Sequence, residues 1–170
     1  MQQQCYEEIN ACIRAHGQVI QSECNYVNAI IEETFRLRPI SDSVPHLSIQ
    51  NVELDGYLIP KNTIILASLL APSVNPETFP DPLRFDPNRH LVNGVFKQHS
   101  HVRPFSVGLR DCPGKRIAKM ELFNFTTNIV KTFKITETPN HDNLEIEEHM
   151  TIFQAKKMKL IFTERDELHE

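Results

Sequence analysis

The residues best suited to chemistry lie at positions 105–114, which read Phe-Ser-Val-Gly-Leu-Arg-Asp-Cys-Pro-Gly. Cys112 comes directly before a segment with helical periodicity, and Pro113 suits the first position of a helix. A helix N-terminus brings partial positive charge and free amide donors, and both favour a thiolate. Gly108 permits the positive φ of a tight turn, and Gly114 leaves no side chain where a flat group could approach the backbone.

Two further side chains complete this loop. Phe105 can shield the sulfur from water, and Arg110 can meet an anion beside it. Together these residues predict a ligand loop for a large, planar, anionic cofactor, and haem with its two propionates fits that description. All ten positions match the haem-binding signature of the haem-thiolate monooxygenases, so the chain resembles the cytochromes P450. The resemblance implies that Cys112 is the proximal iron ligand of haem b and that Arg110 contacts a propionate.

Two other interpretations of Cys112 compete with the ligand loop. A free cysteine is often a small buried hydrophobe with a structural role. A zinc site would recruit His99 and His101, although a closed zinc site needs about four ligands at a recognisable spacing. The other nine positions of the loop favour the haem interpretation over both.

A second group of residues surrounds Glu33 and Arg36, which are spaced to touch on one face of a helix. Such a pair is commonly a solvated surface ion pair. Here it resembles the Glu-x-x-Arg helix of the family, where an arginine from a downstream Pro-x-Arg-Phe motif completes a triad. Residues 85–90 (Phe-Asp-Pro-Asn-Arg-His) supply Arg89, with Asn88 and His90 departing from the usual residues, the usual residue in place of His90 being phenylalanine. We expect the triad to hold the proline-rich segment 72–104 against the helix.

A third feature, Val44-Pro45-His46, resembles the animal microsomal branch of the family. The resemblance implies that His46 approaches a haem propionate, whereas a histidine taken alone is more often an ordinary surface or core residue. Residues 56–61 resemble the same branch. Residues 40–44 and 150–153 correspond to stretches that line the substrate pocket of the family, and their residues do not indicate which substrate is bound.

The resemblance implies a monooxygenase that inserts one atom of O2 into a small hydrophobic organic substrate. Electrons would come from NADPH through a cytochrome P450 reductase. An acidic partner of this kind would be attracted by a cationic patch around the ligand loop, formed by Arg103, Lys115, Arg116 and Lys119. The same four side chains could equally be a solvated helix start. The expected location is the cytoplasmic face of the endoplasmic reticulum membrane.

The resemblance covers only the C-terminal part of the family domain. We expect residues 1–170 to be an incomplete piece of one domain, without the N-terminal membrane anchor and without the distal helix that activates oxygen. No catalytic residue is then expected here besides the haem ligand, and the isolated chain should hold haem weakly and turn over no substrate. The alternatives are a truncated, inactive product and a thiol-based or zinc-binding interaction module.

Composition sets limits on the function. The chain has 170 residues, 40% hydrophobic and 24% charged, which is typical of a globular protein. A formal net charge of -4 argues against nucleic-acid binding, which normally needs a basic face. Four cysteines without a C-x-x-C pair favour a reducing compartment. Residues 64–71 form the longest apolar stretch, which is too short to span a bilayer.

The elements that must position these residues are divided by proline. Ten of the eleven prolines fall at positions 39–113, so this third should consist of loops, turns and short strands. The periodicity predicts two helices before Pro39 and one helix after Pro113. It also predicts strands at 57–59 and 63–66 around a turn, an irregular stretch over 72–104, and a terminal hairpin of 150–153 with 158–162. The predicted fold class is α+β, a mainly helical domain with small sheets and a proline-rich meander before the ligand loop.

Overall fold

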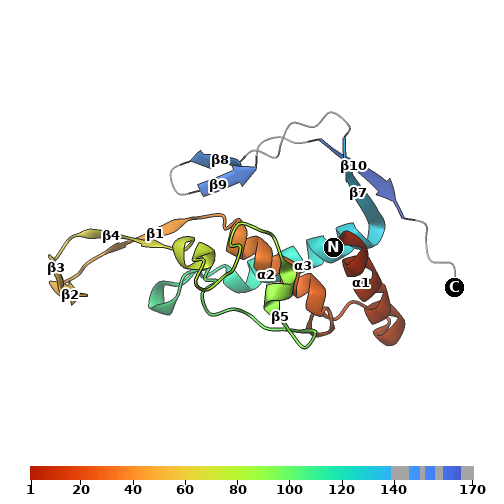
Figure 1. Cartoon of the computed structure of the whole chain (residues 1–170), viewed down its shortest axis with the longest axis horizontal. Coiled ribbons are helices and arrows are strands. Elements are labelled where there is room, and N and C mark those ends of the chain that lie inside the picture. Colours follow the sequence, from red (N-terminus) through yellow and green to blue (C-terminus); the bar gives the residue numbers. More distant parts are fainter. Residues whose placement is uncertain (139–145, 150–151, 156–158, 166–170) are drawn as a thin grey trace.

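The computed structural model describes residues 1–138, 146–149, 152–155 and 159–165, and the chain has the predicted α+β architecture (Figure 1). The three predicted α-helices are confirmed, and the second ends before Pro39. One short 3₁₀ turn lies between α1 and α2, and three more lie between α2 and α3. The helical elements are α1 (Gln2–His16), η1 (Gln21–Glu23), α2 (Asn25–Leu37), η2 (Ala71–Val74), η3 (Pro87–His90), η4 (Gly108–Arg110) and α3 (Lys115–Thr132).

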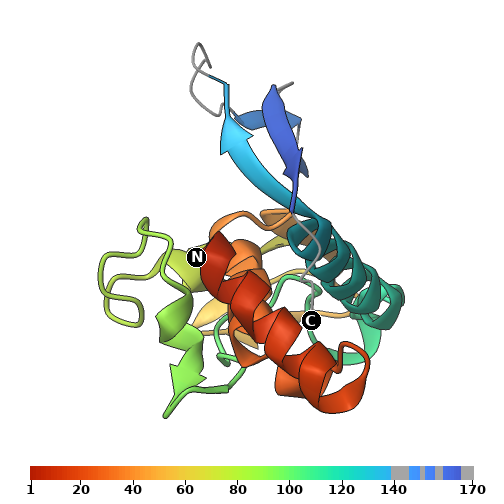
Figure 2. The same ribbon diagram turned by 90° about the vertical axis from the view of Figure 1, so that its right-hand side faces the viewer.

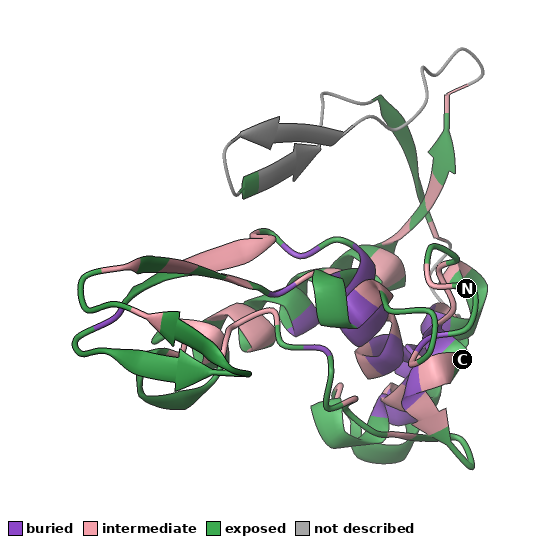
Figure 3. Cartoon of the chain, turned by 60° about the vertical axis from the view of Figure 1, so that its left-hand side comes forward, coloured by how far each residue is buried: buried purple, intermediate pink, exposed green. Residues whose placement is uncertain are grey.

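The core lies where the three α-helices meet (Figures 2 and 3). Cys5, Ile9 and Cys12 of α1 recur on one helical face and are buried against Val27 of α2 and Phe123 of α3. Burial of apolar side chains is the main favourable contribution to folding, so this cluster fixes how the helices pack.

The N-terminus of α2 has no capping side chain of its own, and Glu8 of α1 takes that role. The Glu8 carboxylate accepts hydrogen bonds from the backbone amides of Tyr26 at 2.8 Å and Val27 at 2.9 Å. These amides have no partner within the helix, and the negative charge of Glu8 also interacts favourably with the positive end of the helix dipole. The contact therefore sets the start of the helix that carries Glu33 and Arg36.

All the sheets of the described residues are antiparallel pairs of strands. The pairs are β1 (Ser43–Leu47) with β4 (Ile64–Ser68), β2 (Val52–Leu54) with β3 (Tyr57–Ile59), β5 (Leu91–Val92) with β6 (Val95–Phe96), β7 (Phe133–Glu137) with β10 (Leu160–Glu164), and β8 (Ile146–His149) with β9 (Ile152–Ala155). Pairs β1–β4 and β2–β3 form a ribbon that extends away from the helices (Figure 1).

The strands predicted around residues 60–62 exist, but they do not pair with each other. Strand β3 returns to β2 across Asp55 and Gly56, both at positive φ, as a two-residue hairpin turn requires. Strand β4 instead pairs with the earlier strand β1. Periodicity identifies a strand but does not identify its partner.

The predicted terminal hairpin is wrong for the same reason. Strand β10 pairs with β7, the strand that directly follows α3, and Phe162 packs against Phe133 with ring centroids 5.8 Å apart. Strand β9 pairs with β8. The predicted hairpin residues Met150, Thr151 and Met158 lie outside the described residues.

The proline-rich stretch is less irregular than predicted. It contains η2, η3 and the small β5–β6 hairpin, whose turn residues Asn93 and Gly94 both have positive φ. Between these elements the backbone has no regular partner, so its carbonyl groups are free to accept hydrogen bonds from side chains elsewhere.

The chain exposes an unusually large and apolar surface. Its accessible surface is 12512 Å², whereas a compact protein of this mass exposes about 8,600 Å². Helix α3 shows why, because Ile117, Met120 and Phe125 are all exposed and only Phe123 and Thr127 are buried. Figure 3 shows the buried residues gathered on the helices and the far end of the β ribbon exposed.

Candidate functional site

The loop of Cys112 is closed by its own backbone. The Cys112 amide donates to the carbonyl of Phe105 at 2.9 Å, which brings the two ends of the loop together. Between them, Ser106 and Gly108 have φ values of 63° and 84°. Gly108 adopts this left-handed conformation without the steric penalty of a Cβ, as its place in the sequence predicted.

The helix after the loop begins later than predicted. Helix α3 starts at Lys115 with Gly114 as its N-cap, so Pro113 stands before the helix and not at its first position. The first hydrogen bond of the regular helix runs from the Ala118 amide to the Gly114 carbonyl at 2.9 Å. Residues Cys112 and Pro113 belong to a turn in which the Lys115 amide donates to the Cys112 carbonyl at 3.2 Å.

Backbone and thiol are open on one side of this loop. Cys112 is the one exposed cysteine, and within the described part of the chain its sulfur makes no hydrogen bond. A Cβ added at Gly114 would meet only the Cys112 Sγ, at 3.8 Å, and one added at Gly108 would meet nothing within 4 Å. An exposed thiol bordered by bare backbone fits a flat, sulfur-ligated cofactor such as haem.

Phe105 connects the loop to the helix behind it. Its ring meets that of Phe35 edge to face, with centroids 5.2 Å apart. Phe35 is buried in turn against Phe79 and Val102. Because the Phe105 carbonyl also accepts the hydrogen bond from the Cys112 amide, the position of the cysteine depends on this aromatic contact with α2.

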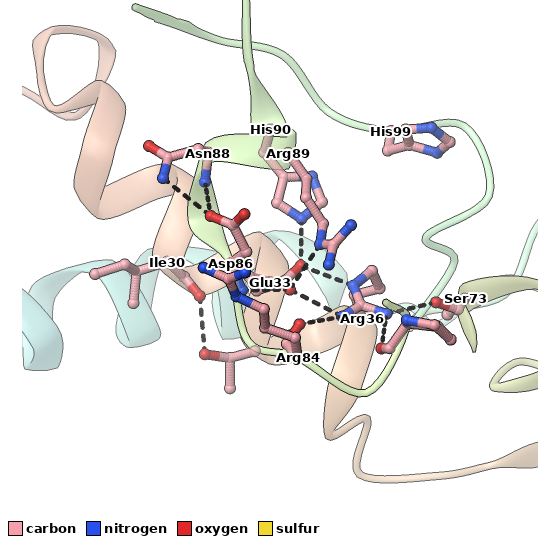
Figure 4. A network of polar contacts seen from close by, with 12 residues as sticks. Ile30, Glu33, Arg36, Ser73, Arg84, Asp86, Asn88, Arg89, His90 and His99 are labelled. Atoms are coloured by element: carbon pink, nitrogen blue, oxygen red, sulfur yellow. Dashed lines mark hydrogen bonds and ion pairs between the residues drawn. The ribbon is translucent and has the colours of Figure 1, made fainter. Parts of the chain in front are cut away.

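Arg36 of α2 uses all of its hydrogen-bond donors (Figure 4). Its Nε and Nη2 bind the two carboxylate oxygens of Glu33 at 2.7 and 2.8 Å. The remaining donors reach backbone carbonyls of the meander: Nη1 donates to Ser73 at 2.8 Å and Pro82 at 2.7 Å, and Nη2 donates to Arg84 at 3.2 Å. Arg36 is fully buried, so this complete set of partners offsets the loss of its hydration.

Arg89 and His90 approach Glu33 from the end of η3. The Nε of Arg89 lies 3.6 Å from Glu33 Oε1, within ion-pair distance, and has no hydrogen-bond partner. His90 is 1% exposed, and its Nε2 lies 2.8 Å from Glu33 Oε2. The structure thus brings Glu33, Arg36 and Arg89 together and adds His90, a residue that the sequence reasoning did not include. The signal for it was a polar residue where the motif has phenylalanine.

Glu33 is held as a carboxylate by this network. Burial by itself raises its pKa, but the hydrogen bonds from Arg36, His90 and the Asp86 amide outweigh burial and lower the pKa from 4.5 to about 2. The Asp86 amide donates to Oε1 at 2.9 Å. A buried, ionised and multiply bonded carboxylate is demanding about geometry, so the network fixes α2 relative to the meander.

Comparisons with known proteins agree with this geometry. The sequence pattern of the family described as Cytochrome P450 matches residues 1–162. The chain belongs to the cytochrome P450 family. Similar relatives include Cytochrome P450 2M1 of Oncorhynchus mykiss, 39% identical over 124 residues that make up 72% of this chain and 25% of the relative. Cytochrome P450 2C2 of Oryctolagus cuniculus is 37% identical over 82% of this chain and 29% of its own length.

A plant relative extends the likeness to nearly the whole P450 chain. Phenylalanine N-monooxygenase of Arabidopsis thaliana is 30% identical over 96% of this chain and 32% of the relative. The chain thus spans a quarter to a third of the length of these curated relatives.

Two residues expected near the haem propionates stand apart from the network. His46 is exposed on β1, opposite Ile65 of β4, and Arg110 is exposed at the end of η4. In the parts of the P450 chain described here, neither side chain has a hydrogen bond or an ion pair. Both side chains are therefore free to contact an anion.

The two histidines of the zinc interpretation lie beside each other without a third ligand. The ring centroids of His99 and His101 are 5.4 Å apart, and His99 also packs on Phe79. Burial, followed by the proximity of His101, lowers the pKa of His99. The described residues contain no group of three or more histidine, cysteine or acidic side chains that could hold a metal ion.

The cationic side chains around the loop are partly paired. Arg103 and Arg116 are exposed, while Lys115 lies 3.8 Å from the Asp111 carboxylate. Burial raises the pKa of the Glu32 carboxyl, and the positive charge of Lys119 partly offsets that rise.

No helix among the described residues is both long and apolar enough to cross a membrane.

Proposed function

We propose that this chain is the haem-ligand portion of a cytochrome P450 monooxygenase and that residues 1–170 form an incomplete part of one domain. Two observations support incompleteness: the chain matches a quarter to a third of its relatives, and α3 leaves Ile117, Met120 and Phe125 exposed. Large apolar surfaces of this kind are normally covered by protein or membrane.

The single observation that carries the proposal is the exposed thiol of Cys112 on a closed loop with open backbone at Gly108 and Gly114. In this proposal Cys112 ligates the iron of haem b, and Arg110 and His46 take the propionates. When bound, the haem supplies oxygen activation, with the thiolate favouring O–O cleavage and one oxygen atom entering a C–H bond of the substrate.

The chain's own residues position the ligand. Phe105 packs against Phe35 of α2 and so connects the loop to that helix. The hydrogen bond from the Cys112 amide to the Phe105 carbonyl fixes the direction of the cysteine. The Arg36–Glu33 network holds the meander against α2. No side chain of this chain is assigned to proton delivery, which belongs to the distal helix of the family.

The partners follow from the family. We propose a small hydrophobic organic substrate and electrons from NADPH through a cytochrome P450 reductase. The docking patch would be Arg103, Lys115, Arg116 and Lys119, and the attraction would be weakened by salt. Reduction rates that do not change between low and high ionic strength would contradict this patch. The proposed location is the endoplasmic reticulum membrane, facing the cytoplasm.

The test is a reduced, carbon monoxide difference spectrum after addition of haem. The protein should be expressed both as these 170 residues and in the reading frame extended upstream of Met1. We expect a red-shifted, thiolate-type Soret band in the extended protein that disappears in Cys112→Ser, which has the same shape but a poor ligand. Absence of the band from both proteins would refute the haem function.

The completeness of the domain is tested separately. The 170-residue chain is expected to hold haem weakly and to turn over no substrate, because one face of the cofactor would be uncovered. Efficient hydroxylation by the 170 residues with a reductase would show that the domain is complete. An interrupted frame upstream of Met1 would instead favour an inactive truncated product.

A further inference from the structure

Each oxygen of the Glu33 carboxylate accepts two hydrogen bonds, and Arg89 makes none of them. Oε1 accepts from Arg36 Nη2 and from the Asp86 amide. Oε2 accepts from Arg36 Nε and contacts His90 Nε2 at 2.8 Å. Arg89 Nε stays at 3.6 Å as a buried donor without a partner, and Arg89 Nη2 donates instead to the carbonyl of Asp81 at 2.9 Å.

We propose that His90, and not Arg89, is the third hydrogen-bonding side chain of this network and acts as a positioning residue. An ionised carboxylate only accepts hydrogen bonds, so the proton must be on His90 Nε2. His90 Nδ1 is buried and has no partner. The neutral Nε2–H tautomer leaves only a lone pair unpaired there, whereas a proton on Nδ1 would be a buried donor without an acceptor.

The position of His90 shows which segments its hydrogen bond to Glu33 connects. His90 is the last residue of η3, and its carbonyl accepts the Lys97 amide at 2.8 Å, next to the β5–β6 hairpin. On the far strand of that hairpin, the Phe96 amide donates to Asn25 of α2 at 2.9 Å. The hairpin is thus attached to α2 at both ends, by His90 at Glu33 and by Phe96 at Asn25.

The same helix supports the ligand loop through Phe35 and Phe105. A link from His90 to haem retention therefore rests on the proposed function, whereas its hydrogen bond to Glu33 does not. Arg89 contributes charge at the edge of the network and a contact to the meander, which is a different role from that of a hydrogen-bond donor.

The experiment compares three variants of the 170-residue chain by urea unfolding at pH 7. His90→Leu removes the donor and should lower the folded-to-unfolded ratio about ten- to a hundredfold, the range for a hydrogen bond to a charged group. His90→Gln places an amide N–H where Nε2 stood and should stay within about fivefold of the original chain. Arg89→Met should lose less than His90→Leu, because Arg89 Nε has no acceptor and the one hydrogen bond that is lost, from Nη2 to the Asp81 carbonyl, is exposed.

Nitrogen NMR of the imidazole in the unaltered chain reports which ring nitrogen carries the proton, and a merely structural role of His90 would not determine this. We expect a protonated Nε2 and an unprotonated Nδ1. A proton on Nδ1 alone, a glutamine variant as unstable as the leucine variant, or a larger loss in Arg89→Met would each overturn the proposal. If His90→Leu does not fold, the glutamine variant and the spectrum still decide.

The haem proposal and the His90 proposal fail in different measurements. Loss of the thiolate band from every protein would remove the haem function and leave the unfolding and NMR results intact. A normal thiolate band together with an Nδ1–H tautomer of His90 would leave the haem function intact and overturn the His90 proposal.

Discussion

Replacing Arg36 with alanine should lower the free energy of unfolding by about 3–5 kcal/mol, the cost of leaving one partner of a buried ion pair alone. The structure gives the reason. Glu33 would keep only His90 and the Asp86 amide as hydrogen-bond partners, with Arg89 at ion-pair distance, while remaining fully buried. The carbonyls that Arg36 reaches in the meander would also lose a donor.

The pKa of Glu33 leads to a similar magnitude. A value of about 2 in the folded chain, against 4.5 for an ordinary glutamate, corresponds to about 3 kcal/mol of stabilisation. Because the folded pKa is the lower one, this stabilisation is present above pH 4.5 and is lost as the pH falls towards 2. Arg36→Ala should therefore remove most of it at neutral pH and unfold with a shallower dependence on pH in that window.

The assay is urea unfolding followed by circular dichroism at pH 7 and pH 3, with the carbon monoxide band measured on the extended protein. Arg36→Lys is the matched control, because it keeps the charge but cannot form the two-pronged contact with Glu33. We expect it to fall between the alanine variant and the original chain. An alanine variant with unchanged unfolding midpoints and normal haem content would refute the reasoning.

Three further outcomes are expected. Glu8→Ala should cost about 1–2 kcal/mol by uncapping α2, while Glu7→Ala on the exposed side of α1 should be nearly neutral in the same urea unfolding assay. A thiol reagent at pH 8 should modify Cys112 quickly and spare Cys24, because burial raises the pKa of Cys24 to about 12; equal rates, read by mass spectrometry, would contradict this. Gly108→Ala should cost about 1–2 kcal/mol from its positive φ and weaken the carbon monoxide band; an undiminished band would argue against the open backbone there.

Much of the fold could be predicted from local signals. Apolar residues at helical spacing located α1, α2 and α3, and proline marked where α2 had to end. The polar spacing of Glu33 and Arg36 predicted their contact, since residues three apart on a helix face each other. Positive φ at Gly108 followed from the absence of a side chain.

What could not be predicted was which distant segments meet. The strands at 152–155 and 160–164 have patterns that suit each other, yet they pair with β8 and β7, because pairing depends on where the chain returns in space. Helix α3 begins at Lys115 and not at Pro113 for a local reason, because its first hydrogen bond runs from the Ala118 amide to the Gly114 carbonyl.

The functional groups of this chain can be identified in its sequence: a cysteine in a ten-residue loop, a glutamate with an arginine one turn later, and an arginine within the proline-rich segment. How these groups bond to one another depends on the packing of the folded chain. Hydrogen bonds depend on tenths of an ångström, so it took the packing of η3 on α2 to keep Arg89 at 3.6 Å and bring His90 to 2.8 Å from the same carboxylate.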